Sequence, residues 1–316
     1  MTTTETNGEY VIAELVVGNP DTFAKMFDKM KKMVEEFSLT WWKGGIKGRR
    51  ISRCGSFIID LAISPDADCM MDTTVSAKKR RTNTTLETID TEGSDIRTGP
   101  KYKFMLDDEQ EVTSVVNLET LHRVLALGNS ADTIKLSLMS FSPQGEPSSL
   151  KFHADSREYQ TYMEVTLLAL DGDEKVEINP VAHQFMFSMP STEFQKALRE
   201  MGGAAEGKEI AFRLVSDNNG GSNIEVTVTG TMNSPCVRVI NGNRSEEMTI
   251  TNISLEPPDP SETERYSIGC LREFASLYSC AHTVAVFVGY QVPIKVNYRV
   301  PDIGYITLYL APKISE

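Results

Sequence analysis

The stretch VPIKVNYRVPDIGYITLYLAPKI runs from Val292 to Ile314, near the end of the chain. Its Ile294–Val300 segment alternates apolar and polar residues, and this period of two predicts a β-strand. The Thr283–Gly289 segment before it is rich in β-branched and apolar residues and predicts a second strand. Further upstream, Ile268–Tyr278 has apolar residues at helical spacing. The end of the chain therefore predicts a helix followed by strands.

The rest of the chain repeats this mixture of helix and strand. Apolar residues at helical spacing predict three more helices, at Thr22–Phe37, Leu118–Leu127 and Thr192–Met201. Asp21 or Asn19 can cap the first of these. Further strands are predicted at Tyr10–Val17, Phe57–Ile63, Thr133–Met139, Tyr162–Leu168, Ile210–Val215 and Ile224–Thr229. The order of these elements indicates two copies of one plan, each with two helices and several strands.

Two copies agree with the length of 316 residues, which suggests about two domains. We expect a first domain over residues 1–168, a polar connector over 169–183 and a second domain over 184–316. A polar segment at about 65–100 interrupts the first domain and reads as a flexible insertion. It carries AKKRR at Ala77–Arg81, which fits a nuclear import signal, a DNA-reaching arm or a solvated loop equally well.

Composition excludes several classes of protein. The chain has 32 basic and 44 acidic residues, a net charge of −12, so it does not bind nucleic acid through its overall charge. Its four histidines and five cysteines lack the spacing of a metal site, and no nucleotide-binding or hydrolase motif is present. We therefore expect no metal, no cofactor and no enzymatic activity. The polar start and the absence of a long apolar run predict neither secretion nor a membrane span.

Basic residues gather on the polar faces of the predicted helices. A helix packed on a sheet exposes the stripe opposite its apolar face. A solvated surface is the simplest interpretation, but a basic helix face inside an acidic protein also suits a phosphate backbone. The residues on these faces are Lys25, Lys29, Lys31, Lys32, Arg123, Lys196, Arg199 and Arg272.

The C-terminal stretch closely resembles the terminal segment of the proliferating cell nuclear antigen (PCNA) family, the sliding clamps of eukaryotes and archaea. The matching parts are a strand at Val292–Tyr298, a turn at Pro301–Gly304 and a strand at Leu308–Lys313. MPSTEFQKALREM, at Met189–Met201, resembles the start of the family's second domain. VVNLETLHRVLALGNSADTIKLSL, at Val115–Leu138, resembles a helix and strand of its first domain.

The resemblance implies an α+β fold with two similar clamp domains per chain, each with helices on one face of antiparallel sheets. It implies a homotrimeric ring that encircles duplex DNA without reading its sequence, acts in replication and repair in the nucleus or at a cytoplasmic replication site, and tethers DNA polymerase. The basic helix residues would line the hole. The implied partners are DNA, a polymerase, a clamp loader and client proteins that bind through short aromatic-anchored peptides.

The resemblance also implies two protein-binding surfaces. The partner-binding residues would be Ile51, Ile58, Pro180, Pro293, Tyr309, Leu310, Ala311, Pro312 and Lys313. The subunit interface would use Tyr162, Val165 and Leu167 of the first domain with Cys236, Val237 and Val239 of a strand at Ser234–Ile240.

Two other interpretations stay open. The chain fits a clamp-like subunit of a heteromeric checkpoint-type ring, or a monomeric processivity factor, because RRISRCGSF at Arg49–Phe57 departs from the family's loop. Clamps often have a basic or polar residue at four positions of the helices where this chain has Ala24, Ala126, Gly269 and Ser276. The third interpretation, an enzyme on a double-domain β scaffold, rests only on acidic clusters in the sequence.

Overall fold

The computed structural model describes residues 5–6, 8–64, 100–107, 109–143, 146–169, 178–179, 181–204, 207–216, 221–231, 235–242, 248–253 and 263–313. The predicted insertion at 65–100, with AKKRR, lies outside the described residues except for Pro100, and so does most of the predicted connector. The proposed boundaries between the two domains therefore stay a prediction.

Each helix in the described part of the chain follows one strand and precedes another. The helices are α1 (Pro20–Met30), α2 (Leu118–Ala126), α3 (Ser191–Ala204) and α4 (Ile268–Phe274), and α4 continues into the 3-10 helix η1 (Ala275–Ser279). Side-chain caps fix three of the starts: Asn19 accepts from the Thr22 amide, Asn117 from that of Thr120 and Ser267 from that of Cys270. The prediction of four helices is confirmed.

The strands form three sheets, and every pair of neighbouring strands described is antiparallel. The first sheet has the order β1-β2-β8-β9-β10, and β6 pairs with β2. Its strands are β1 (Glu5–Thr6), β2 (Glu9–Val17), β6 (Lys101–Phe104), β8 (Thr133–Ser140), β9 (Pro147–Asp155) and β10 (Gln160–Thr166). The four-stranded sheet has the order β14-β13-β12-β16. It consists of β12 (Gly207–Ser216), β13 (Ser222–Gly230), β14 (Cys236–Asn241) and β16 (Arg265–Ser267).

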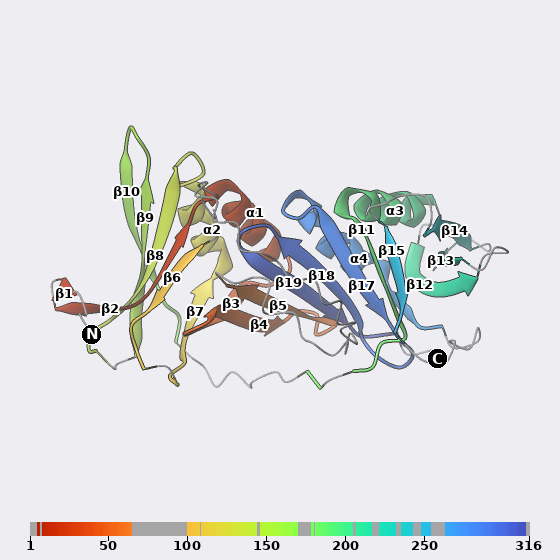
Figure 1. The fold of residues 1–316 in the computed structure, drawn as a ribbon, viewed down its shortest axis with the longest axis horizontal. Helices are drawn as coiled ribbons and strands as arrows, with labels where there is room; N and C mark the ends of the chain where they lie inside the picture. Colours follow the sequence, from red (N-terminus) through yellow and green to blue (C-terminus); the bar gives the residue numbers. More distant parts are fainter. Residues whose placement is uncertain are drawn as a thin grey trace, which may run out of the picture.

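A nine-stranded sheet joins the two halves of the chain, in the order β15-β11-β17-β18-β19-β5-β4-β3-β7. From the first half come β3 (Glu36–Trp42), β4 (Gly45–Ile51), β5 (Phe57–Ile63) and β7 (Val112–Asn117). From the second half come β11 (Phe185–Pro190), β15 (Thr249–Asn252), β17 (Thr283–Val288), β18 (Ile294–Val300) and β19 (Gly304–Leu310). The halves meet where β19 pairs with β5 (Figure 1).

The turn between β18 and β19 needs glycine at residue 304. Gly304 has a φ of +155°, and a Cβ there would lie only 1.9 Å from the Ala62 carbonyl oxygen of β5. A side chain at this position would therefore push β19 away from β5. The glycine allows the two halves to share one sheet.

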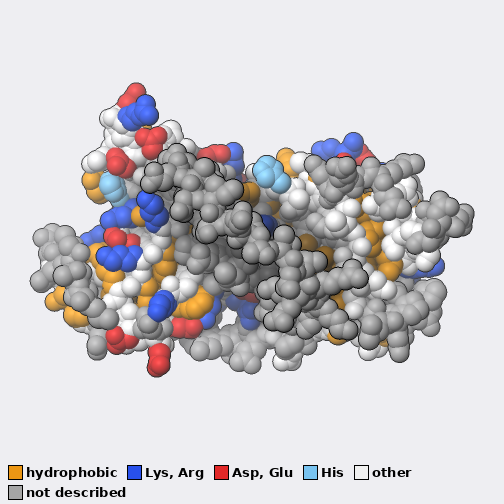
Figure 2. Space-filling view, viewed as in Figure 1, with side chains coloured by type: hydrophobic (Ala, Val, Ile, Leu, Met, Phe, Trp, Pro, Cys, Tyr) orange, Lys and Arg blue, Asp and Glu red, His pale blue; other side chains and the backbone are white. Residues whose placement is uncertain are grey.

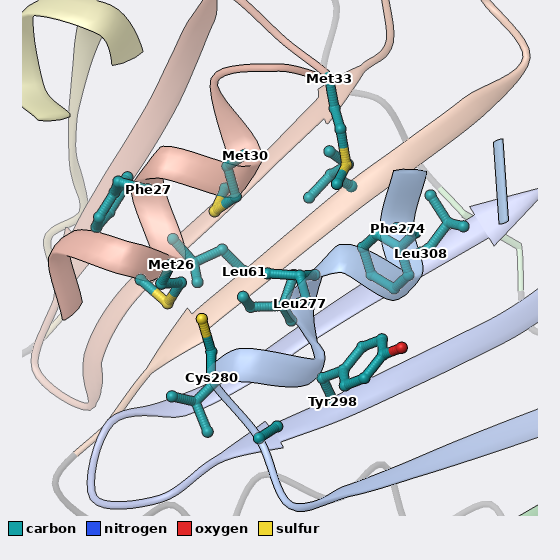
Figure 3. Packing of buried hydrophobic residues seen from close by; sticks show 14 of the residues in the cluster. Met26, Phe27, Met30, Met33, Leu61, Phe274, Leu277, Cys280, Tyr298 and Leu308 are labelled. Carbon is teal, nitrogen blue, oxygen red and sulfur yellow. The ribbon is translucent and has the colours of Figure 1, made fainter. Parts of the chain in front are cut away.

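The helices cover one face of the sheets, and their apolar sides form one hydrophobic cluster with the strands. Figure 3 shows α1 of the first half beside η1 of the second, with Met26 and Met30 facing Leu277 and Cys280. On the same side of the sheet, the Phe274 and Tyr298 rings meet edge to face with centroids 5.4 Å apart. The two halves therefore share a core as well as a sheet.

The predicted end of the first helix was wrong. The first helix ends at Met30 instead of Phe37: the amides of Lys32 and Met33 donate to carbonyls only three residues back, at Lys29 and Met30, and Phe37 lies in β3. Met33, Val34 and Phe37 are nevertheless buried, so helical periodicity continued through a turn that fills the core. The last α-helix ends at Phe274, and its final turn tightens into η1.

Candidate functional site

The basic residues of α1 and α2 lie opposite the buried sides of these helices, and acidic neighbours accompany most of them. Lys25 is exposed, and its Nζ lies 2.5 Å from Asp21 one turn earlier. Arg123 is exposed and donates to Glu119 over 3.0 Å. Lys32 is exposed and has no carboxylate within 4.0 Å among the described residues. This face thus offers cations, but several of them already have an anionic partner.

A compact ion cluster links α1 to α2. The Asp28 carboxylate lies 3.4 Å from both Lys29 Nζ and Lys31 Nζ, and 3.6 Å from His122 Nε2. Lys31 Nζ also lies 3.2 Å from Glu119 and donates to His122 Nδ1 over 2.9 Å. An ammonium group only donates, so His122 is neutral with its proton on Nε2, toward Asp28. The predicted DNA residue Lys31 is therefore largely enclosed by its own protein.

The cluster also shifts pKa values. Partial burial and the nearby Lys31 charge lower the pKa of His122, and the charges of Asp28 and Glu119 only partly oppose them. Burial raises the pKa of Asp28, but hydrogen bonds from Lys31 and Lys29 and the charge of Lys32 outweigh it, so the net shift is downward. Near neutral pH the cluster therefore holds charged lysines and carboxylates around an uncharged imidazole.

Arg199 of α3 and Arg272 of α4 lie at a depression between these two helices, whose other lining residues are Gln195, Gly269 and Glu273. Arg199 and Arg272 are exposed and have no carboxylate within 4.0 Å among the described residues. Lys196 is exposed and 4.0 Å from Glu200, which Arg238 of β14 holds at 2.9 Å. All eight predicted DNA residues therefore lie on, or directly after, helices that share one side of the molecule (Figure 1).

On the opposite face of the nine-stranded sheet, strand register places predicted partner-binding residues next to each other. Ile51 of β4 pairs with Ile58 of β5, and Ile58 pairs with Tyr309 of β19. The row continues through Lys295 of β18 to Phe287 of β17. Ile51 is exposed, and the other four are half-buried. We call Ile51, Ile58, Tyr309, Lys295 and Phe287 the outer row.

The chain end lies beside this row. The Ala311 amide donates to the Ser56 carbonyl over 3.3 Å, and the Lys313 amide to that of Arg265 over 2.7 Å. Ala311 and Lys313 are exposed, while Pro312 and Pro293 are half-buried. Leu310 was predicted to bind partners, and the structure corrects this. Its side chain is buried in the core, because neighbouring residues of a strand point to opposite faces. Pro180 lies outside the described residues.

The predicted interface strands are edges at opposite ends of the molecule (Figure 1). Tyr162 of β10 is 67% exposed, and Val237 and Val239 of β14 are 52% and 49% exposed. Cys236 and Leu167 are half-buried. Val165 was predicted to lie at the subunit interface, and the structure corrects this, because its side chain is 1% exposed and belongs to the core. In Figure 2 the tip above β10 carries both acidic and basic side chains.

Comparison with known proteins places this geometry in a family. Residues 177–313 match the model of the proliferating cell nuclear antigen C-terminal domain. Proliferating cell nuclear antigen 2 of Drosophila melanogaster is 26% identical over 208 residues, which cover 66% of this chain and 74% of the relative. The crystal structure of the Entamoeba histolytica antigen superposes with a TM-score of 0.69 at 16% identity, and covers 96% of this chain and all of that one. These matches support a divergent PCNA-type clamp. The predicted fold and family are confirmed, and so is the prediction of a non-enzymatic protein, since clamps of this family are not enzymes.

Sequence reasoning missed two residues of the clamp's surfaces. Met163 of β10 is exposed at the same edge as Tyr162 but points to the other face of the sheet. Lys295 stands in the outer row between Tyr309 and Phe287. The alternation of Ile294–Val300 could have identified Lys295 as facing away from the core, since Ile294 and Val296 are buried on either side of it.

The clamp's described residues contain no cluster of three or more His, Cys, Asp or Glu that could hold a metal ion. Within the same residues, no helix is long and apolar enough to cross a membrane.

Proposed function

We propose that this clamp is a homotrimeric sliding clamp that encircles duplex DNA and serves as a processivity factor for DNA polymerase and other replication and repair proteins. The proposal rests on the separation of three features: a basic helical side, an outer row on the other side of the nine-stranded sheet, and two strand edges at opposite ends of the molecule. A chain with two unlike edges at opposite ends suits head-to-tail closure into a ring.

The edges support ring closure through their chemistry. Unpaired strand edges expose backbone N–H and C=O groups that a second strand can satisfy. Tyr162 and Met163 would add apolar area on both faces of β10, and Val237 and Val239 on one face of β14. A heteromeric ring would use the same edges with unlike neighbours, so the mass of the assembly separates the two candidates.

The helical side supports contact with a duplex passing through the ring. Backbone phosphates need cations but no defined register, which is what sliding requires. Lys32, Arg199 and Arg272 have no carboxylate partner among the described residues and would contact phosphates first. The lysines near Asp21 and Asp28 would contribute less, because a phosphate must compete with those carboxylates.

The outer row and the chain end support client docking. Half-buried apolar side chains beside an exposed chain end suit a short peptide with aromatic anchors, and anchors seated among such residues carry most of the binding energy. A clamp loader and a DNA polymerase are the proposed clients. Work on chromosomal DNA would place the clamp in the nucleus, or at a cytoplasmic replication site if the DNA is replicated there.

Light scattering over a range of concentrations tests the assembly. We expect a mass of three times the 35.1 kDa chain. A mass of one chain at every concentration would refute the homotrimer and direct the search to partner subunits.

Retention on nicked circular DNA after loading tests DNA encirclement. Changing Lys25, Lys29, Lys196 and Arg199 together to Glu should weaken retention without changing the trimer. Changing Lys101 and Lys103 to Glu is the control, since both are exposed on the side of the first sheet away from the helices. Equal retention by the two variants would contradict a DNA-facing helical side.

A further inference from the structure

Lys295 is the one charged residue of the outer row. The register places it between Tyr309 of β19 and Phe287 of β17. Its Nζ lies 5.1 Å from the Phe287 ring centroid and 5.8 Å from that of Tyr309. Ring faces attract cations at such distances, so the two aromatic side chains hold the ammonium group in place. The charge is therefore positioned within the row rather than directed freely into solvent.

No carboxylate lies within 4.0 Å of Lys295 Nζ among the described residues. Other cations of this sheet face have one: Lys47 contacts Glu111 at 2.5 Å, and Arg49 contacts Asp60 at 2.6 Å. A titratable group also lies beside this row: the His183 ring packs 5.7 Å from that of Phe287. Burial first, and the Lys295 charge in addition, lower the pKa of His183, so it is neutral near pH 7 and supplies no counter-charge.

This arrangement has a consequence for any peptide that covers the row. A peptide that contacts Ile58 and Tyr309 must also remove water from the Lys295 ammonium, because these residues are direct neighbours. Removing water from an unpaired charge opposes binding unless an opposite charge replaces the water. A carboxylate on the peptide would do so, and the apolar surroundings would strengthen the pair.

We propose that Lys295 selects client peptides that carry an aspartate or glutamate next to their aromatic anchors. The inference rests on the proposed client-binding function of the outer row and adds a charge requirement to it. The occupant is a short anionic peptide segment of a partner protein. Clients with the same anchors but a neutral or basic residue at that position would bind more weakly.

The test uses the full-length clamp and a set of synthetic, fluorescein-labelled 16-residue peptides. The parent peptide is an amphipathic helix former with two adjacent Phe anchors and no acidic residue near them. Derivatives carry a single Asp, Asn or Lys at each of the four positions before the anchors. Fluorescence anisotropy measures Kd for the unchanged clamp and for Lys295→Met, Lys295→Glu and Lys47→Met.

Lys47→Met is a matched control. Lys47 Nζ lies 5.5 Å from the centroid of the Trp42 ring, on the same sheet face, so it reproduces the cation–ring geometry outside the outer row. Removing it should leave every ratio of Asp to Asn affinities unchanged.

We expect at least one Asp peptide to bind about 10-fold more tightly than its Asn counterpart, in line with close charge pairs at interfaces. Lys295→Met should abolish that ratio, and Lys295→Glu should favour the Lys peptide. Equal binding of all Asp and Asn peptides to the unchanged clamp would overturn the inference but keep the client site. Failure of every peptide, the parent included, would overturn both.

Discussion

Removing the Asp28 charge should tighten DNA binding and weaken the fold at the same time. Asp28 lies 3.4 Å from both Lys29 and Lys31, and it also faces His122. Asp28→Asn removes the anion that competes with DNA phosphates for Lys29, and one of the two that compete for Lys31, which also contacts Glu119. Most surface substitutions either change binding alone or lower stability and binding together, so opposite changes in one variant identify this cluster.

The magnitude follows from the number of cations released. Each phosphate contact made by a cation steepens the slope of log K against log salt by about 0.9. One released lysine therefore adds about a 3-fold change in affinity across a four-fold change in salt, and two add about 10-fold. The Asp28 side chain is 28% exposed, so losing its ion pairs should lower the free energy of unfolding by only about 1 kcal/mol.

The assay is DNA binding by fluorescence anisotropy at four salt concentrations, with urea unfolding of the same preparation. Asp60→Asn is the matched control: it removes one carboxylate of nearly equal exposure, 27%, from an ion pair on the opposite sheet face. It should lower stability similarly and leave the salt slope unchanged. An unchanged slope for Asp28→Asn, or an equal change in both variants, would refute the argument that Asp28 withholds lysines from DNA.

Three further outcomes are expected. His122→Asn should reduce the loss of stability between about pH 7 and pH 5.5 in urea unfolding. The folded state depresses the His122 pKa below 6.5, so stability is full above 6.5 and falls as pH drops below it; an unchanged pH profile would contradict this. Tyr298→Phe should leave the free energy of unfolding unchanged or raise it by about 1 kcal/mol, because the buried Tyr298 hydroxyl has no hydrogen-bond partner among the described residues. A clear loss of stability in thermal unfolding would show that the hydroxyl does have a partner. Val237→Glu with Val239→Glu should convert a trimer to single chains in light scattering with the melting temperature of the chain preserved, and an intact trimer would exclude β14 from the interface.

The sequence predicted the elements well because their signals are local. A strand such as Ile294–Val300 alternates buried residues with half-buried or exposed ones, and the structure reproduces its bounds. The first helix was predicted to end seven residues too late, because Met33, Val34 and Phe37 are as apolar as a helix face and point into the same core. After Met30 the backbone tightens into hydrogen bonds that span three residues, such as Met33 to Met30, and the apolar pattern of the side chains does not reveal this change.

The candidate site was predictable only in part, since its chemistry depends on contacts between distant segments. The basic helix faces follow from helical spacing alone. Helical spacing does not predict that Lys31 contacts His122 and Glu119. Those residues lie on another helix, 88 or more positions away in the sequence. The exposed edges and the chain-end site came from the family resemblance, which fixed the strands but not every side-chain direction: Val165 and Leu310 belong to the core.

These two corrections show how closely the scaffold and the candidate client site are linked. In β5, Ile58 faces outward and Ile59 inward; in β19, Tyr309 faces outward and Leu310 inward. The same pairing that aligns Ile58 with Tyr309 therefore aligns core residues one position away. A one-residue slip of β19 would turn Tyr309 toward the core and expose Leu308 and Leu310, so the core would lose two large apolar side chains. The core thus fixes the register that forms the outer row, so substitutions at outward positions of these strands can alter client binding without disturbing the shared core.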